Sequence, residues 1–108
     1  MTNNVKFTKT MTYTYGVRNI VWQEIISFAK QYSVSKIVLF GSRARGDYKK
    51  TSDIDLAVWG GNIPAFALDV DEETSTLLSF DIVNMDGAVQ PELRESIMRE
   101  GVAIYEKV

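Results

Sequence analysis

Two aspartates near the middle of the chain have the spacing of a metal-binding pair. Asp53 and Asp55 are separated by Ile54, at the start of the run DIDLAV. Strand side chains alternate between faces, so a strand here would place both carboxylates on one face. At ~5 Å and an effective dielectric of ~20, their repulsion would cost roughly 3 kcal/mol, and less where water reaches them. A divalent cation turns this repulsion into attraction, and Mg²⁺ prefers one or two carboxylates together with phosphate oxygens.

A glycine and a serine stand upstream of this pair. Gly41 and Ser42 directly follow the run IVLF, which is short and β-branched at its start and therefore predicts a buried strand. Glycine lets a backbone turn sharply or approach a ligand closely. The N–H groups and the hydroxyl of such a turn can contact phosphate, especially where a helix begins. The stretch from Ile37 to Val58 could thus hold both a triphosphate and the metals that activate it.

These segments resemble the signature of the DNA polymerase β-like nucleotidyltransferase superfamily. LFGSRARG, followed by SDIDL, is close to the form found in its minimal members, the MNT-type domains. The resemblance spans residues 17–106. It implies a third carboxylate on a later strand, for which Asp81 in the run FDIV is the candidate and Asp86 the competitor. An aspartate between Phe80 and Ile82 in a strand is unfavourable unless something holds its charge.

The resemblance implies a reaction and its cofactors. A nucleoside monophosphate, AMP from ATP, would pass to a hydroxyl acceptor with release of pyrophosphate. Asp53, Asp55 and Asp81 would be the catalytic residues and would bind two Mg²⁺ ions, or Mn²⁺. The two ions would clamp the attacking and leaving oxygens of an in-line displacement.

The resemblance also implies nucleotide contacts around the glycine. Gly41 and Ser42 would hold the β- and γ-phosphates, beside a short helix beginning near Arg43. Arg43 or Arg45 could pair with phosphate oxygens bidentately. The alternative for each arginine is a solvated charge on a one-turn helix.

Minimal members of the superfamily are often encoded beside a helical HEPN-type partner. Some of these pairs are toxin–antitoxin systems in which the nucleotidyltransferase adenylylates the toxin. The resemblance therefore implies a HEPN-type protein as acceptor, with a tyrosine as the modified residue. Two other hypotheses stay open: an antitoxin that covers its partner without catalysis, and a sensor that binds ATP without releasing pyrophosphate. Homo-oligomerisation is also left open.

Two other motif interpretations fail. A Walker A loop needs Lys and Ser or Thr directly after its second glycine, whereas Asp47 and Tyr48 follow Gly46. Metal-dependent glycosyltransferases also use Asp-x-Asp, but their nucleotide-binding domains are much larger and lack the preceding Gly-Ser.

Composition narrows the chemistry further. The chain has 108 residues, which suits one domain, and its net charge of −2 gives no sign of nucleic-acid or membrane binding. It has neither Cys nor His, which excludes disulfides, thiolate or His-ligated zinc, and His-based triads. No transmembrane run or signal-peptide core is evident, so we expect a cytoplasmic protein.

The expected fold is α/β, or α+β by looser naming, over residues 17–108. A small mixed sheet would comprise residues 36–40, 54–58 and 79–84, and residues 102–105 would form a short final strand or a capping segment. Helices are predicted at 17–32, at 65–73 after Pro64, and from Pro91 to the residue before Gly101. We expect the first and last helices on one face of the sheet, and Ser42 and the three aspartates on the other. Residues 1–16 would be an N-terminal extension: an edge strand, an arm or a leader.

Overall fold

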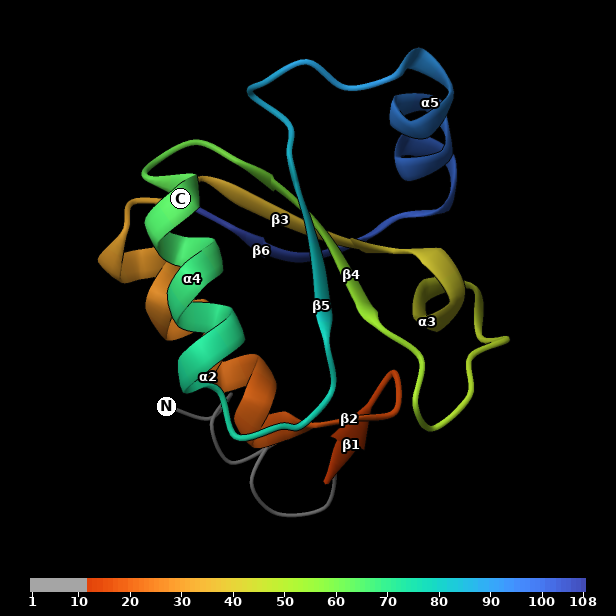
Figure 1. Ribbon diagram of the computed structural model, residues 1–108. Coiled ribbons are helices and arrows are strands. Elements are labelled where there is room, and N and C mark those ends of the chain that lie inside the picture. Colours follow the sequence, from red (N-terminus) through yellow and green to blue (C-terminus); the bar gives the residue numbers. More distant parts are fainter. Residues whose placement is uncertain (1–11) are drawn as a thin grey trace.

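A four-stranded mixed sheet forms the centre of this computed structural model, which describes residues 12–108 (Figure 1). The strand order is β5-β4-β3-β6. β3 (Lys36–Phe40) pairs antiparallel with β4 (Ile54–Trp59) and with β6 (Val102–Glu106), and β4 pairs parallel with β5 (Phe80–Asn84). The mixed α/β fold and the three predicted sheet strands agree with the sequence prediction, and β6 joins the sheet as a fourth strand. Residues 1–11 of the predicted N-terminal extension lie outside the described residues.

Four helices and a short hairpin complete this part of the chain. The helices are α2 (Asn19–Gln31), α3 (Gly41–Arg45), α4 (Ile63–Glu73) and α5 (Pro91–Glu100). β1 (Tyr13–Thr14) pairs with β2 (Val17–Arg18), so the first helix begins two residues later than predicted. No helix among residues 12–108 is long and apolar enough to cross a membrane.

One face of the sheet is covered by α2 and α4, which lie side by side (Figure 1). Alternate strand residues point toward them, because side chains on a strand alternate between faces. These residues and the helix residues packed on them form the larger core, which includes Ile37, Leu39, Ile54, Leu56, Val58, Val21, Ile25, Phe66 and Val70. Burial of this set of branched and aromatic side chains fixes the register of β3 against β4.

The opposite face is covered in part by α5, so the prediction that the first and last helices share a face was wrong. Ile97 of α5 packs with Val38, Phe40, Ala57 and Met85 in a second, smaller core. On this face Phe40 lies beside Asp55, its register partner on β4, and Asp81 follows on β5. The apolar residues that pack with Ile97 are buried, whereas Asp55 is half-buried and Asp81 is exposed.

α5 ends at Gly101, as predicted. Many helices end at a glycine because it adopts a left-handed backbone conformation, but Gly101 does not. Its φ is −69°, a conformation open to any residue. A Cβ at Gly101 would lie 2.3 Å from Val38 Cγ1 and 2.4 Å from the Ile97 carbonyl oxygen. The glycine is therefore required by the close approach of α5 to β3.

The larger core predicts a sharp contrast between two leucines. Leu56 on β4 is fully buried, whereas Leu68 on α4 is 56% exposed. Leu56→Ala should lower the free energy of unfolding by about 2–5 kcal/mol, because it removes buried methyl groups and leaves a cavity. Leu68→Ala should change it by about 0.5 kcal/mol or less. Urea unfolding followed by tryptophan fluorescence measures both, and equal effects would contradict this description of the core.

Candidate active site

Asp55 lies between Gly41 and Asp81. In the sheet, Asp55 pairs with Phe40 of β3 on one side and with Asp81 of β5 on the other. A Cβ built on Gly41 would lie only 2.1 Å from Asp55 Oδ2, and the φ of Gly41 is +75°. Gly41 is thus needed twice over, for its backbone conformation and for the approach of its Cα to the carboxylate.

Asp53 stands just before β4, two residues ahead of Asp55. Strand alternation directs both toward the face that Asp81 shares. Asp53 and Asp81 are exposed, and Asp55 is half-buried. Within residues 12–108, no hydrogen bond or ion pair engages any of the three carboxylates. The structure therefore brings the three predicted acidic positions to one end of one face, with oxygens free for a ligand.

The environment of Asp55 disfavours its charge. Burial, followed by the negative charges of Asp81 and Asp53, raises the pKa of Asp55 to about 6. The guanidinium groups of Arg45 and Arg43 act in the opposite direction and lower it. The Asp55 carboxyl is therefore partly protonated near neutral pH.

The donor chemistry of this end fits a hard divalent cation. All three side chains offer only carboxylate oxygens, the ligands that Mg²⁺ prefers, and a cation would relieve the repulsion that acts on Asp55. As they stand, no three acidic side chains of the described chain are gathered closely enough to enclose a metal ion. Asp53 and Asp81 are exposed and unpartnered, so their side chains are free to turn toward one.

The predicted phosphate turn lies at the start of α3, beside Asp55. β3 ends at Phe40, and Gly41 and Ser42 begin the helix directly. The carbonyl oxygen of Ser42 accepts hydrogen bonds from the N–H groups of Gly46 and Asp47, at 2.8 and 3.2 Å, which close the short helix. Gly46 ends it in a left-handed conformation, with φ of 95°. Gly41 and Ser42 are therefore adjacent to the carboxylates.

Arg43 is buried, although the sequence suggested a phosphate contact or a solvated charge. Its side chain is 1% exposed. The guanidinium donates hydrogen bonds to the carbonyl oxygens of Tyr15, Lys49, Lys50 and Ser52, at distances of 2.9 to 3.4 Å. Tyr48 also stacks on it, with 4.8 Å between the guanidinium carbon and the ring centroid. These contacts give Arg43 a structural role, and we leave it out of the proposed nucleotide contacts.

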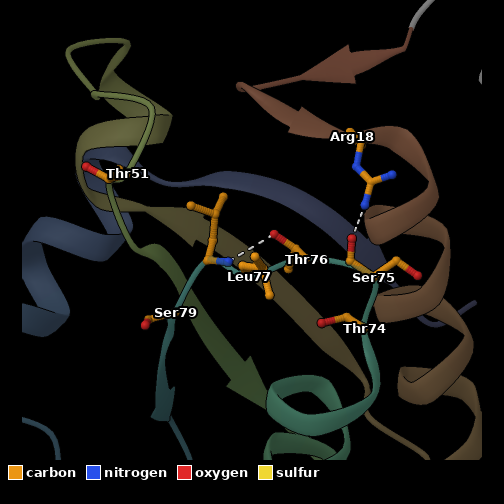
Figure 2. A pocket seen from close by; sticks show the side chains of 8 residues that line it. Arg18, Thr51, Thr74, Ser75, Thr76, Leu77 and Ser79 are labelled. Carbon is orange, nitrogen blue, oxygen red and sulfur yellow. Dashed lines mark hydrogen bonds between the residues drawn. The ribbon is translucent and has the colours of Figure 1, made fainter.

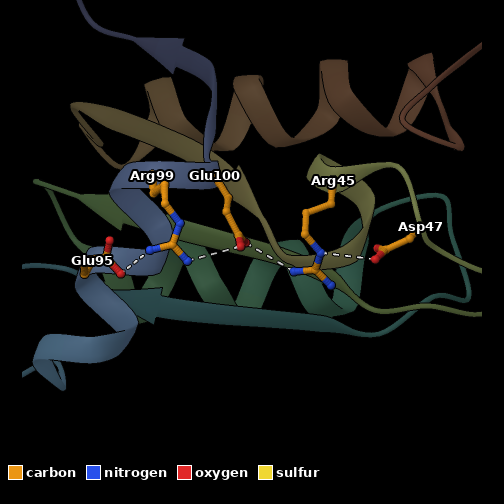
Figure 3. A network of polar contacts seen from close by, with 5 residues as sticks. All are labelled: Arg45, Asp47, Glu95, Arg99 and Glu100. Carbon is orange, nitrogen blue, oxygen red and sulfur yellow. Dashed lines mark hydrogen bonds and ion pairs between the residues drawn. The ribbon is translucent and has the colours of Figure 1, made fainter.

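Arg45, by contrast, lies on the surface in a chain of ion pairs (Figure 3). Its Nε lies 3.3 Å from Asp47 Oδ2, and its Nη1 lies 3.2 Å from Glu100 Oε1. Glu100 also pairs with Arg99, which in turn pairs with Glu95 one helical turn earlier on α5. Glu100 was not singled out in the sequence, because it is 55 residues from Arg45 and only folding brings them together.

The other charged candidates lie elsewhere. The carboxylate of Asp86 accepts a hydrogen bond of 2.8 Å from the N–H of Gly60, so Asp86 stabilises a turn, whereas Asp81 is the residue beside Asp55. Lys49 and Lys50 are exposed, as expected of loop charges. Strand register therefore places Asp81, and not Asp86, beside Asp55.

Comparison with known families agrees with this arrangement. The family model described as "Polymerase beta, Nucleotidyltransferase" matches residues 23–108. The chain belongs to this nucleotidyltransferase family. It is also similar to a Methanocaldococcus jannaschii protein whose name provisionally assigns it protein adenylyltransferase activity. The two are 33% identical over 82 residues, which cover 67% of this chain and 79% of that protein.

Solved structures share the fold. A toxin–antitoxin crystal structure with AMP-PNP aligns with a TM-score of 0.64 over 80% of this chain and 73% of that one, at 23% identity. A structure described provisionally as a minimal nucleotidyltransferase aligns with a TM-score of 0.58, covering 75% of this chain and 86% of that chain, at 28% identity. A Sulfolobus solfataricus protein described provisionally as a nucleotidyltransferase aligns at 0.51, with 22% identity, over 81% of this chain and 78% of that chain.

The two arginines of α3 should differ in their effect on stability. Arg43→Met removes charge-assisted hydrogen bonds and leaves part-buried carbonyl oxygens without donors, so it should lower the free energy of unfolding by at least about 2 kcal/mol. Arg45→Met breaks only exposed ion pairs and should change it by about 1 kcal/mol or less. Chemical denaturation of both variants provides the measurement. A small effect of Arg43→Met would refute the structural role.

The raised pKa of Asp55 predicts a pH-dependent effect of Asp55→Asn. The folded state binds this proton more tightly than the unfolded state, so wild type should lose stability as pH rises from about 4 to about 6. Asparagine does not titrate, so Asp55→Asn should be more stable relative to wild type at about pH 8 than at about pH 4. Denaturation without divalent metal tests this prediction. Asp71→Asn, at an exposed position of α4, is the charge control. A pH-independent difference between Asp55→Asn and wild type would contradict it.

Proposed function

We propose that the chain transfers AMP from ATP to a hydroxyl group of a protein acceptor and releases pyrophosphate. The observation that supports this best is the position of Asp55, between Gly41 at the start of α3 and Asp81 on β5, in a member of the nucleotidyltransferase family. A phosphate-binding turn and a carboxylate pair thereby lie side by side.

In this proposal Gly41 and Ser42 bind the β- and γ-phosphates, with Arg45 pairing with a phosphate oxygen. Arg45 meets Asp47 and Glu100 through Nε and Nη1, which leaves the N–H groups on Nη2 free among the described residues. Fixing the outer phosphates directs attack to the α-phosphorus. The acceptor oxygen forms its bond there as the bond to the bridging oxygen breaks, and pyrophosphate leaves.

Asp53, Asp55 and Asp81 would hold the divalent ions, Mg²⁺ or Mn²⁺. Such ions, when bound, supply positive charge to the attacking and leaving oxygens. Asp81 is exposed at the edge strand of the sheet, and we assign it a second role, accepting the proton from the acceptor hydroxyl at a carboxylate oxygen. Asp55 is half-buried in the centre and stays beside the phosphate turn.

The setting that we propose is a toxin–antitoxin pair in which a HEPN-type protein is the acceptor, modified on a tyrosine. Its support is the likeness to a toxin–antitoxin structure containing AMP-PNP, an ATP analogue, and the similarity to the M. jannaschii protein. The same likeness favours ATP as the donor.

Labelled ATP tests the reaction. With Mg²⁺ and lysate of the source organism, label from the α-phosphate of ATP should appear on an acceptor, whereas label from the γ-phosphate should not. Asp53→Asn and Asp55→Asn should each lower the rate by at least about 100-fold, because each removes a carboxylate that would hold the metal ions whose charge stabilises the transition state. Asp71→Asn should transfer normally and serves as the control.

Unchanged transfer by Asp53→Asn or Asp55→Asn would refute the assignment of these residues. Binding of ATP without transfer by wild type would instead favour the nucleotide sensor. Neutralisation of a toxin by Asp55→Asn, without transfer, would favour a binding antitoxin.

A further inference from the structure

A groove opens between Arg18, Thr51 and the loop of residues 74–79 (Figure 2). Its volume is about 700 Å³, within the range of ligand sites in proteins. Residues 74–79, which connect α4 to β5, form most of its wall. Thr51 of the loop before β4 and Arg18 of β2 form the rest.

The groove lies on the β5 side of Asp55. Thr51 is two residues before Asp53, and Ser79 is two residues before Asp81. The N–H of Ile54 donates a hydrogen bond of 2.9 Å to the carbonyl oxygen of Ser79, which fixes the starts of β4 and β5 side by side. A ligand in the groove would therefore lie next to two of the three carboxylate positions.

We propose that this groove binds a short acidic peptide segment of the acceptor protein and presents its hydroxyl at Asp81. The inference rests on the proposed function, in which Gly41 binds the phosphates of the donor. In an in-line displacement the attacking oxygen approaches opposite the leaving group. Gly41 lies on the β3 side of Asp55, and the groove opens on the β5 side, so the two substrates reach the carboxylates from different directions.

The lining suits a peptide backbone. Five of the eight lining residues have a side-chain hydroxyl. The hydroxyls of Thr51 and Ser79 make no hydrogen bond within residues 12–108. A hydroxyl both donates and accepts, so it can pair with a peptide N–H or C=O whatever the sequence of the ligand. The groove can thus hold a main chain and leave its central side chain to reach the carboxylates.

Arg18 and Leu77 indicate which residues would flank the acceptor residue in the bound peptide. Arg18 is the one charged residue in the lining, and it donates a hydrogen bond to the Ser75 carbonyl oxygen with other N–H groups to spare. The lining itself has no carboxylate, and the nearby Glu24 carboxylate accepts hydrogen bonds from the N–H and the hydroxyl of Ser75, so Arg18 is the charge that a ligand in the groove would meet directly. Leu77 is fully exposed at the groove, where it offers apolar contact to a protein ligand.

A nucleic acid fits this surface poorly. α4, which leads into the groove loop, has acidic side chains at Asp69, Asp71, Glu72 and Glu73. One arginine beside four carboxylates would repel a polyanion overall, whereas a peptide with one or two acidic residues needs only a local partner. The observations therefore favour a protein segment.

Peptide titration of the ¹⁵N-labelled chain by NMR tests binding without catalysis. The probes are two short capped peptides with a central tyrosine, one flanked by glutamates and one by lysines. The glutamate peptide should bind more tightly and shift amides in residues 74–79. Arg18→Glu should weaken its binding by about threefold to tenfold and favour the lysine peptide, because the charge contact is exposed. Lys30→Glu makes an equal charge change at an exposed position of α2 and should leave binding unchanged.

A second pair of variants tests the rim. Leu77→Ser should weaken peptide binding by about threefold or more. Leu68→Ser, at an exposed position of α4 away from the groove lining, should not weaken it. Equal binding of both peptides by wild type would overturn the proposal. So would shifts that map outside the groove, or preference for an oligonucleotide over either peptide.

The transfer assay separates this inference from the proposed function. If label passes to an acceptor and neither Arg18→Glu nor Leu77→Ser raises the KM for that acceptor, the groove assignment fails and the activity stands. If no label passes but the glutamate peptide binds residues 74–79 as described, the activity fails and the groove stands.

Discussion

Arg43 is buried, and its guanidinium joins segments that are distant in the sequence. It donates to the carbonyl oxygen of Tyr15 in the first hairpin and to those of Lys49, Lys50 and Ser52 in the loop before β4. A buried charge is tolerated only when its donors are satisfied, so these carbonyl groups must stay where the arginine needs them. The loop that ends at the acidic pair is thereby tied to α3, the helix that begins with the phosphate turn.

The face above this anchor is divided in two. Toward one end, Val38, Ala57 and Met85 form an apolar surface that Ile97 of α5 covers. Toward the other end, Asp55 and its acidic neighbours remain open. Strand alternation alone would place all these side chains on one face, but the helix covers only the apolar part. The result is a half-buried carboxylate at the boundary between a dry core and solvent.

That boundary explains why the site is suited to a charged ligand. Partial burial and neighbouring negative charges both raise the free energy of the ionised Asp55, and the exposed Arg45 offsets this only in part. The neighbouring core cannot stabilise the ionised carboxylate of Asp55, because the side chains of the core are apolar. A cation bound beside Asp55 would lower that free energy, and a ligand that binds only the folded state stabilises it.

The sequence by itself determined most of the secondary structure and the family. Apolar runs located the strands of the sheet, and the run from Gly41 to Asp55 carried the resemblance to the nucleotidyltransferase family. The sequence did not determine long-range packing. The position of α5, the burial of Arg43, the link from Arg45 to Glu100 and the choice of Asp81 over Asp86 all depend on contacts between distant segments. Local patterns fix which faces are apolar, but only strand register and shape complementarity decide which helix covers each face.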